Sequence, residues 1–121
     1  MMEGRIGPGN GIAAARIAAM PDPAGTLGYT PYPGTLNVRL RRRMTLPTAA
    51  ATVVWDRWTA SFHPVRVGNV AGHVVRWSPT NEPVSSVEIV APVRLRDALG
   101  LPERGTVQID GLRTPIRGRA A

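Results

Sequence analysis

Apolar and polar residues alternate along much of this chain with a period of two, which is typical of half-buried strands. The clearest run is Thr35-Leu36-Asn37-Val38-Arg39-Leu40, which follows the turn Pro31-Tyr32-Pro33-Gly34. Two prolines restrict the backbone of this turn, and its glycine permits angles that a side chain would forbid. Similar or β-branched runs predict further strands at Glu3–Ile6, Ala51–Trp58, Pro64–Val70, Gly72–Trp77, Ser85–Ala91 and Gly105–Asp110.

Helical signals are fewer. Pro92 suits a first helical position and Gly100 suits a helix end, so one short helix is predicted near residues 92–99. The alanine-rich segment Ile12–Met20 fits either a helix or a strand of small residues, because its periodicity does not separate the two. Together these elements predict a mainly β fold, a small closed barrel of six to seven strands with Greek-key-like connections and one short helix.

The length of 121 residues fits a single domain, 1–121, with a frayed tail from about residue 114. Apolar residues make up 43% of the chain and charged residues 19%, which is typical of a folded globular protein. Cysteine is absent, so no disulfide or thiolate metal site can form. No apolar run is long enough to span a membrane, and no apolar leader follows Met1. We therefore expect a soluble protein of the cytoplasm.

Fifteen arginines and no lysine contribute to a formal net charge of +7. Such a balance attracts polyanions, although a GC-rich coding sequence also explains arginine in place of lysine. The run Arg39, Arg41, Arg42 and Arg43 is either a solvated rim or a phosphate-binding patch. Charge by itself therefore does not identify the partner.

Two patterns of residues could carry chemistry. The loop Gly7-Pro8-Gly9-Asn10-Gly11 exposes backbone N–H groups that could cradle a phosphate, but a plain flexible turn has the same composition. Thr35 and Asn37 project from one face of their strand, about 6.5–7 Å apart. Their neutral oxygen atoms could hold a hard cation or a polar ligand. The alternative is an ordinary turn that leads into an edge strand.

Glu88 is an unusual residue because it lies inside an apolar run. A carboxylate there has to be solvated, paired or hydrogen-bonded, since burying it alone is prohibitive. It therefore pairs with an arginine or accepts hydrogen bonds from a ligand. The three tryptophans are expected in core or rim packing, with stacking on a planar ligand as the alternative. Both histidines lack partners at metal-ligand spacing and are expected to be structural.

Three separated segments together resemble the CTP-dependent riboflavin kinases, archaeal-type enzymes built as a compact cradle-loop barrel. The segments are the loop Gly7-Pro8-Gly9-Asn10-Gly11, the sequence Gly-Tyr-Thr-Pro-Tyr-Pro-Gly-Thr-Leu-Asn at 28–37, and Ser85–Arg96 followed by Leu99-Gly100-Leu101. Their order and approximate spacing agree over most of residues 3–110. The resemblance implies transfer of the γ-phosphoryl group of CTP to the ribityl 5′-hydroxyl of riboflavin, which gives FMN and CDP.

The resemblance also implies roles for residues of this chain. Thr35 and Asn37 would hold a divalent metal, which agrees with the preference of Mg²⁺ for oxygen ligands. Thr80 and Glu88 fall where the family binds flavin. The nucleotide would contact the glycine-rich loop and the start of the short helix, through Gly7, Pro8, Gly9, Asn10, Gly11, Ile12, Val93, Arg94, Leu95 and Arg96.

Phosphoryl transfer requires donor and acceptor in line and stabilisation of charge by a metal and cations. We hypothesise that Arg94 or Arg96 neutralises developing charge and that Glu88 orients the acceptor. The chain departs from the family at several places, among them residue 12 and residues 21–27. Ile12 stands where relatives often place a polar or basic residue, and 21–27 is a poor helix where relatives carry a helical flap.

Two other functions fit parts of the sequence. A non-enzymatic basic barrel that binds nucleic acid accounts for the charge and for the run 41–43, and predicts binding that falls steeply with salt. A barrel that binds flavin or nucleotide without catalysis is the second. The nucleic-acid interpretation gives no reason for the Thr35/Asn37 pair or for the segment of Glu88. The kinase interpretation expects riboflavin or FMN and CTP or CDP as ligands, Mg²⁺ or another divalent cation as cofactor, and no membrane or nucleic-acid partner. The sequence does not determine the oligomeric state, for which a monomer is favoured.

Overall fold

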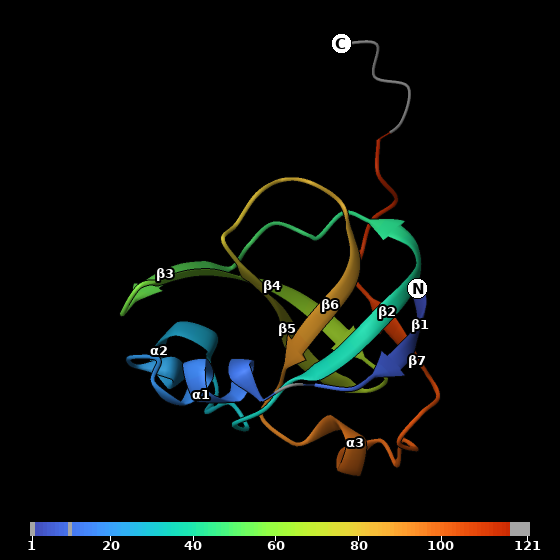
Figure 1. Ribbon diagram of the computed structural model, residues 1–121, viewed down its shortest axis with the longest axis horizontal. Coiled ribbons are helices and arrows are strands. Elements are labelled where there is room, and N and C mark those ends of the chain that lie inside the picture. The colour runs from blue at the N-terminus through green and yellow to red at the C-terminus, as the bar shows by residue number, and fades with distance from the viewer. Residues whose placement is uncertain (1, 10, 117–121) are drawn as a thin grey trace.

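The computed structural model describes residues 2–9 and 11–116, which form seven strands and three short helices (Figure 1). The strands are β1 (Met2–Gly7), β2 (Leu36–Met44), β3 (Ala51–Trp55), β4 (Trp58–Val67), β5 (Val70–Trp77), β6 (Val84–Val90) and β7 (Thr106–Asp110). The helices are α1 (Ile12–Ala18), α2 (Pro23–Leu27) and α3 (Leu95–Ala98). Within the described ranges, no helix has the length and apolar character needed to cross a membrane.

Six of the strands close into a ring in the order β4-β5-β6-β2-β1-β7. All neighbours in the ring are antiparallel, and β4 completes it by pairing with β7. β3 extends the sheet beyond β4 as a seventh strand. The predicted closed barrel of six to seven strands is therefore confirmed.

The third and fourth strands differ from their predicted limits. A turn at Asp56 and Arg57, with Asp56 at φ 53°, divides the predicted strand 51–58, and β4 begins at Trp58. β4 runs unbroken through Pro64, although proline weakens a central strand. Pro64 is tolerated because it lies between the residues of β4 that pair with β3 and those that pair with β7. On that side no strand pairs with Pro64, so its missing N–H costs no hydrogen bond between strands.

The barrel interior holds the main hydrophobic core. Along β2 the predicted alternation is observed, since Leu36, Val38 and Leu40 are buried inside while Asn37 and Arg39 face outward. The core is built from buried residues of all six strands of the ring, the residue after β6 and α3, which are Met2, Ile6, Leu36, Val38, Leu40, Met44, Val65, Val67, Val74, Val87, Ile89, Ala91, Leu95, Val107 and Ile109. Burial of this apolar set fixes which face of each strand looks outward.

A second, smaller core lies outside the barrel, where α1 and α2 lie to one side of the strands (Figure 1). Ile17 and Met20 pack against outward-facing residues of the sheet, among them Phe62, Val75 and Val90. The spacing of Ala13, Ile17 and Met20 is that of one helix face, and alanine favours helix. The ambiguous segment 12–20 is therefore a helix rather than a strand.

The predicted short helix near 92–99 is present as α3, and the described residues contain two further helices, α1 and α2. The segment 21–27, predicted to be a poor helix, forms α2. The Asp22 side chain accepts a hydrogen bond from the Gly25 N–H at 3.2 Å, Pro23 occupies the first turn, and Gly28 at φ 85° ends the helix. α3 is shorter than predicted, since it begins at Leu95 rather than at Pro92, and Gly100 at φ 62° follows it as expected.

Arg16 fixes α1 to the sheet through aromatic rings. Its guanidinium carbon lies 3.6 Å from the centroid of the Trp58 ring and 4.9 Å from that of Trp77. The Trp55 indole N–H also donates to the Arg16 carbonyl oxygen at 3.1 Å. The tryptophans therefore pack as predicted, and two of them bind a cation of the chain itself.

Tyr29 and His73 join the segment after α2 to β5. The Tyr29 hydroxyl lies 2.8 Å from His73 Nδ1 and donates to the Val90 carbonyl oxygen at 3.3 Å. Burial raises the pKa of Tyr29 well above its ordinary range. Burial, and then the charge of nearby His63, lower the pKa of His73 below its usual value near 6.5. The pair is therefore a neutral phenol beside a neutral imidazole at physiological pH.

We expect Arg16→Ala to lower the free energy of unfolding by about 1–2 kcal/mol, because the cation–π contacts with two indole rings are lost. Urea unfolding followed by tryptophan fluorescence measures this difference. Arg57→Ala is the matched control, since Arg57 is exposed in the β3–β4 turn. Equal stability of the two variants would show that the stack does not hold α1.

We also expect the wild-type protein to lose stability as the pH falls through 6.5 and below. The folded state binds the His73 proton more weakly than the unfolded chain does, so the unfolded state takes up more protons in that window. Above that pH window, the free energy of unfolding should not change with the protonation of His73. Denaturant unfolding between pH 7.5 and 5.5 checks this, and His73→Gln should lose less stability than the wild type. An equal loss in both proteins would assign the pH dependence to other groups.

Candidate active site

The end of β1, the start of β2 and the end of β6 meet at the end of the barrel where α3 lies (Figure 1). Gly7 is directly opposite Asn37 in the β1–β2 pair, and Asn37 is directly opposite Glu88 in the β2–β6 pair. Asn37 and Glu88 are half-buried on the outer face, while their strand neighbours are buried inside. Their Cβ atoms are about 4.5–5.5 Å apart in such pairs. Asn37 and Glu88, which were predicted from separate segments, therefore lie side by side in one row with Gly7.

A small hollow of about 220 Å³ lies over this row. Three oxygen-bearing side chains line it, those of Thr35, Asn37 and Glu88. The rest of its wall carries small residues only, which are Gly9, Gly11, Ala13, Ala14 and Gly34. We call this space the small hollow. The structure thus brings together the predicted metal residues, the predicted flavin carboxylate and the glycine-rich loop.

The glycine-rich loop passes close to Asn37. A Cβ atom built on Gly9 would lie 2.7 Å from Asn37 Nδ2, so any side chain at this position would displace the amide. Gly11, at φ 78°, then turns the chain into α1. Asn10, predicted to bind nucleotide, lies outside the described residues. Gly9 is therefore required by the close approach of the loop to Asn37, and Gly11 by its left-handed backbone conformation.

The donor atoms of the small hollow suit a particular kind of cation. No group of three or more His, Cys, Asp or Glu side chains in the described ranges could hold a metal ion by itself. Thr35 and Asn37 supply neutral oxygen atoms and Glu88 supplies a carboxylate. Mg²⁺ often takes only one or two ligands from the protein and the others from water and phosphates. The residues present fit a cation that enters together with a phosphate ligand.

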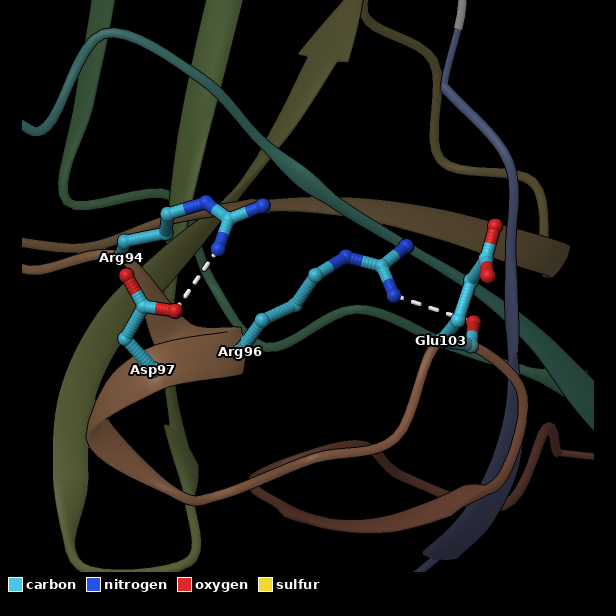
Figure 2. Close-up of polar contacts among 4 residues, drawn as sticks. All are labelled: Arg94, Arg96, Asp97 and Glu103. Atoms are coloured by element: carbon cyan, nitrogen blue, oxygen red, sulfur yellow. Dashed lines mark hydrogen bonds and ion pairs between the residues drawn. The ribbon is translucent and has the colours of Figure 1, made fainter.

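Two arginines of the α3 region, Arg94 and Arg96, border the neighbouring clefts, and Figure 2 shows the contacts that they make. Arg94 forms an ion pair with Asp97 at 2.7 Å. Arg96 donates to the Glu103 carbonyl oxygen at 3.0 Å and to the Gly7 carbonyl oxygen at 3.3 Å. Arg96 thereby ties the beginning of the glycine-rich loop to the segment after α3.

Clefts run on both sides of these arginines. One of about 240 Å³ lies between the turn at 32–36 and residues 93–96, and Thr35 borders both this cleft and the small hollow. The other lies between Pro8, Gly9 and the α3 region. Six of the predicted nucleotide residues border these clefts, namely Pro8, Gly9, Val93, Arg94, Leu95 and Arg96, whereas Gly11 borders the small hollow. The Leu95 side chain is buried in the barrel core, and Ile12 is exposed and borders neither cleft.

A large hollow of about 480 Å³ opens on the other side of Asn37 and Glu88. It forms where β5 and β6 separate, because these strands pair only between His73–Val75 and Glu88–Val90. Its polar and aromatic wall includes Arg39, Arg76, Trp77, Ser85 and Ser86. Sequence reasoning did not select Arg39 and Ser86 as site residues, although the alternation of β2 already placed Arg39 on the face of Thr35 and Asn37.

Thr80 lies apart from Glu88. It belongs to the loop between β5 and β6 and borders a third hollow at the opposite end of the barrel. Its hydroxyl oxygen accepts hydrogen bonds from Arg76 at 2.6 Å and from the Glu82 N–H at 3.2 Å. Arg76 borders both the third hollow and the large hollow. The structure therefore connects Thr80 to the large hollow through the Arg76 side chain.

Comparison with known proteins identifies the family to which this barrel is similar. Residues 22–110 match the model of a family named for CTP-dependent riboflavin kinases and described as domain of unknown function DUF120. The match includes Thr35, Asn37, Glu88 and the α3 region but begins after the glycine-rich loop. That loop is placed in the site by the β1–β2 register and by Gly9 alone.

Curated relatives are riboflavin kinases of archaea. The chain is 36% identical over 90 residues to the riboflavin kinase of Methanocella arvoryzae, which covers 69% of this chain and 42% of the relative. It is 36% identical over 98 residues to that of Pyrobaculum arsenaticum, with 71% and 47% covered. It is 37% identical over 95 residues to that of Pyrococcus abyssi, with 69% and 45% covered.

The chain thus spans less than half the length of the curated relatives it matches. The family match nevertheless extends over most of the barrel, from α2 to β7. The same family is indicated by the barrel fold, by the three sequence segments and by the relatives. The chain belongs to the CTP-dependent riboflavin kinase family.

Proposed function

We propose that this chain transfers the γ-phosphoryl group of CTP to the 5′-hydroxyl of riboflavin, giving FMN and CDP in an Mg²⁺-dependent reaction. The observation that carries the proposal is the row Gly7–Asn37–Glu88, which separates the arginine-flanked clefts from the large hollow. A phosphoryl donor on one side and an acceptor on the other would meet at the small hollow. The name of the family supports CTP and riboflavin as the substrates.

On the nucleotide side, the backbone N–H groups of the glycine-rich loop would bind the phosphates. Arg96 holds this loop against the segment after α3 through its bonds to Gly7 and Glu103. Arg94 is paired only with an exposed carboxylate of Asp97, and such surface pairs are weak. Its guanidinium can therefore turn to a phosphate oxygen at little cost in free energy.

At the small hollow, Thr35 and Asn37 would hold Mg²⁺ together with phosphate oxygens. When bound, the ion supplies positive charge that neutralises the phosphates. The chain contributes preorganisation, because the pairing of β2 with both neighbours fixes Asn37 before any ligand enters.

On the acceptor side, Glu88 would accept a hydrogen bond from the 5′-hydroxyl and orient its oxygen toward the γ-phosphorus. The bond between this oxygen and phosphorus forms as the bond from phosphorus to the β–γ bridging oxygen breaks. The hydroxyl proton passes to the Glu88 carboxylate and the electron pair leaves with CDP. Glu88 has no ion-pair partner within the described residues, so its carboxylate is available for this role.

The large hollow would take the flavin ring system. Its volume of about 480 Å³ and the Trp77 ring in its wall suit a planar ligand. Thr80 would act here by holding the Arg76 guanidinium in the wall.

The test is to incubate the purified chain with riboflavin, Mg²⁺ and either CTP or ATP, and to separate the flavins by chromatography. We expect FMN with CTP in preference to ATP. Binding of flavin without FMN formation under any condition would favour a non-catalytic flavin-binding barrel. A chain that neither binds flavin nor forms FMN would contradict the proposal entirely.

Asn37→Ala should lower the turnover number by about 100-fold or more while leaving riboflavin affinity nearly unchanged, because the amide acts on the phosphates and not on the flavin ring. Steady-state kinetics and quenching of flavin fluorescence measure the two quantities. Asn69→Ala is the matched control, since Asn69 is exposed in the β4–β5 turn. Normal turnover of Asn37→Ala at saturating Mg²⁺ would remove Asn37 from the metal site.

Gly9→Ala should reduce activity strongly, whereas Gly7→Ala should be tolerated. A Cβ at Gly9 would lie 2.7 Å from Asn37 Nδ2, while one at Gly7 would meet no atom within 4 Å. Comparison of turnover and of nucleotide KM in the two variants measures the difference. Similar kinetics for both would show that the close approach of Gly9 to Asn37 does not matter for the reaction.

A further inference from the structure

Two arginines stand directly opposite each other on the outer face of the barrel. Arg5 of β1 pairs in register with Arg39 of β2, and both are exposed. Like charges at directly opposed positions destabilise a sheet. Neither guanidinium has a hydrogen-bond or ion-pair partner within residues 2–9 and 11–116. The pair is therefore an uncompensated concentration of positive charge.

The other arginines near the site are already engaged. Arg94 is paired with Asp97, and Arg96 donates to two carbonyl oxygens. Arg76 donates to the Thr80 hydroxyl and to the Glu82 carbonyl oxygen. Arg39 thus differs from the remaining cations of the site in having its full donor set available.

The position of Arg39 relates it to the flavin rather than to the nucleotide. It follows Asn37 by two residues on the same face of β2, about 6.5–7 Å further along and away from Thr35. It borders the large hollow and is absent from the walls of the two clefts beside α3. Ser86, opposite Arg39 on β6, adds a hydroxyl to the same wall.

We propose that Arg39, supported by the charge of Arg5 and by the Ser86 hydroxyl, forms a seat for the phosphate monoester of the flavin product. That phosphate forms beside Asn37 and Glu88, which border the large hollow together with Arg39. The inference rests on the proposed function. A phosphate carries close to two negative charges at neutral pH and accepts charge-assisted hydrogen bonds from guanidinium groups. Riboflavin is neutral and has the same ring and ribityl chain as FMN. The seat therefore distinguishes product from substrate and holds the product more tightly.

The test compares equilibrium affinities for riboflavin and FMN, without nucleotide, by quenching of flavin fluorescence. We expect Arg39→Gln to weaken FMN binding about tenfold and to leave riboflavin binding within about twofold of wild type. Arg5→Gln should act in the same direction with a smaller effect. Arg42→Gln is the matched control, because Arg42 is an exposed arginine of the same strand outside the large hollow, and should change neither affinity.

The unchanged riboflavin affinity shows in the same experiment that the variant is folded. If Arg39→Gln binds both flavins but keeps the wild-type ratio of FMN to riboflavin affinity, the seat is wrong and the kinase proposal stands. An equal effect in Arg42→Gln would assign the change to general charge and would also overturn the seat. A wild-type chain that binds neither flavin would overturn the kinase proposal together with this inference.

Discussion

The pairing of β2 with both β1 and β6 is the constraint on which the site depends. It places Asn37 between Gly7 and Glu88, three residues that are far apart in the chain. A slip of one residue in β2 would turn Asn37 into the barrel and bring Leu36 or Val38 to the surface. Burial of those two side chains in the main core opposes the slip. The hydrophobic core therefore determines the geometry of a polar site on the opposite face.

Small residues and one arginine complete the site around this row. Gly9 lets the loop backbone approach the Asn37 amide, and the alanines at the start of α1 leave the small hollow open. Arg96 fastens the loop to the segment after α3, while Arg16 fastens α1 to the outer face of the sheet. The loop is thus held at both ends by guanidinium groups that bind parts of the protein itself.

Much of this arrangement could be predicted from sequence because it follows from local patterns. Alternation identified β2 and β7, and the Thr35/Asn37 spacing placed both side chains on one face. Glu88 could be selected as a site residue because a carboxylate inside an apolar run needs a partner. The strand register that puts Glu88 opposite Asn37 depends on barrel closure, which no local pattern encodes. α2 was missed because its stability comes from Asp22, Pro23 and packing of Leu27 on the second core. The hydrogen bonds that Arg96 donates and the position of Thr80 likewise depend on tertiary contacts, which local patterns do not predict.

The most direct test asks where a divalent cation binds. Mn²⁺ broadens the NMR resonances of nearby amides, so substoichiometric Mn²⁺ can be added to ¹⁵N-labelled protein in the presence of CDP. We expect the amides of Gly9, Thr35 and Asn37 to broaden first, and those of Thr45 and Arg113, which pair at the other end of the barrel, to stay sharp. Broadening centred elsewhere, or spread evenly over the exposed carboxylates, would contradict a shared site built by the glycine-rich loop and β2.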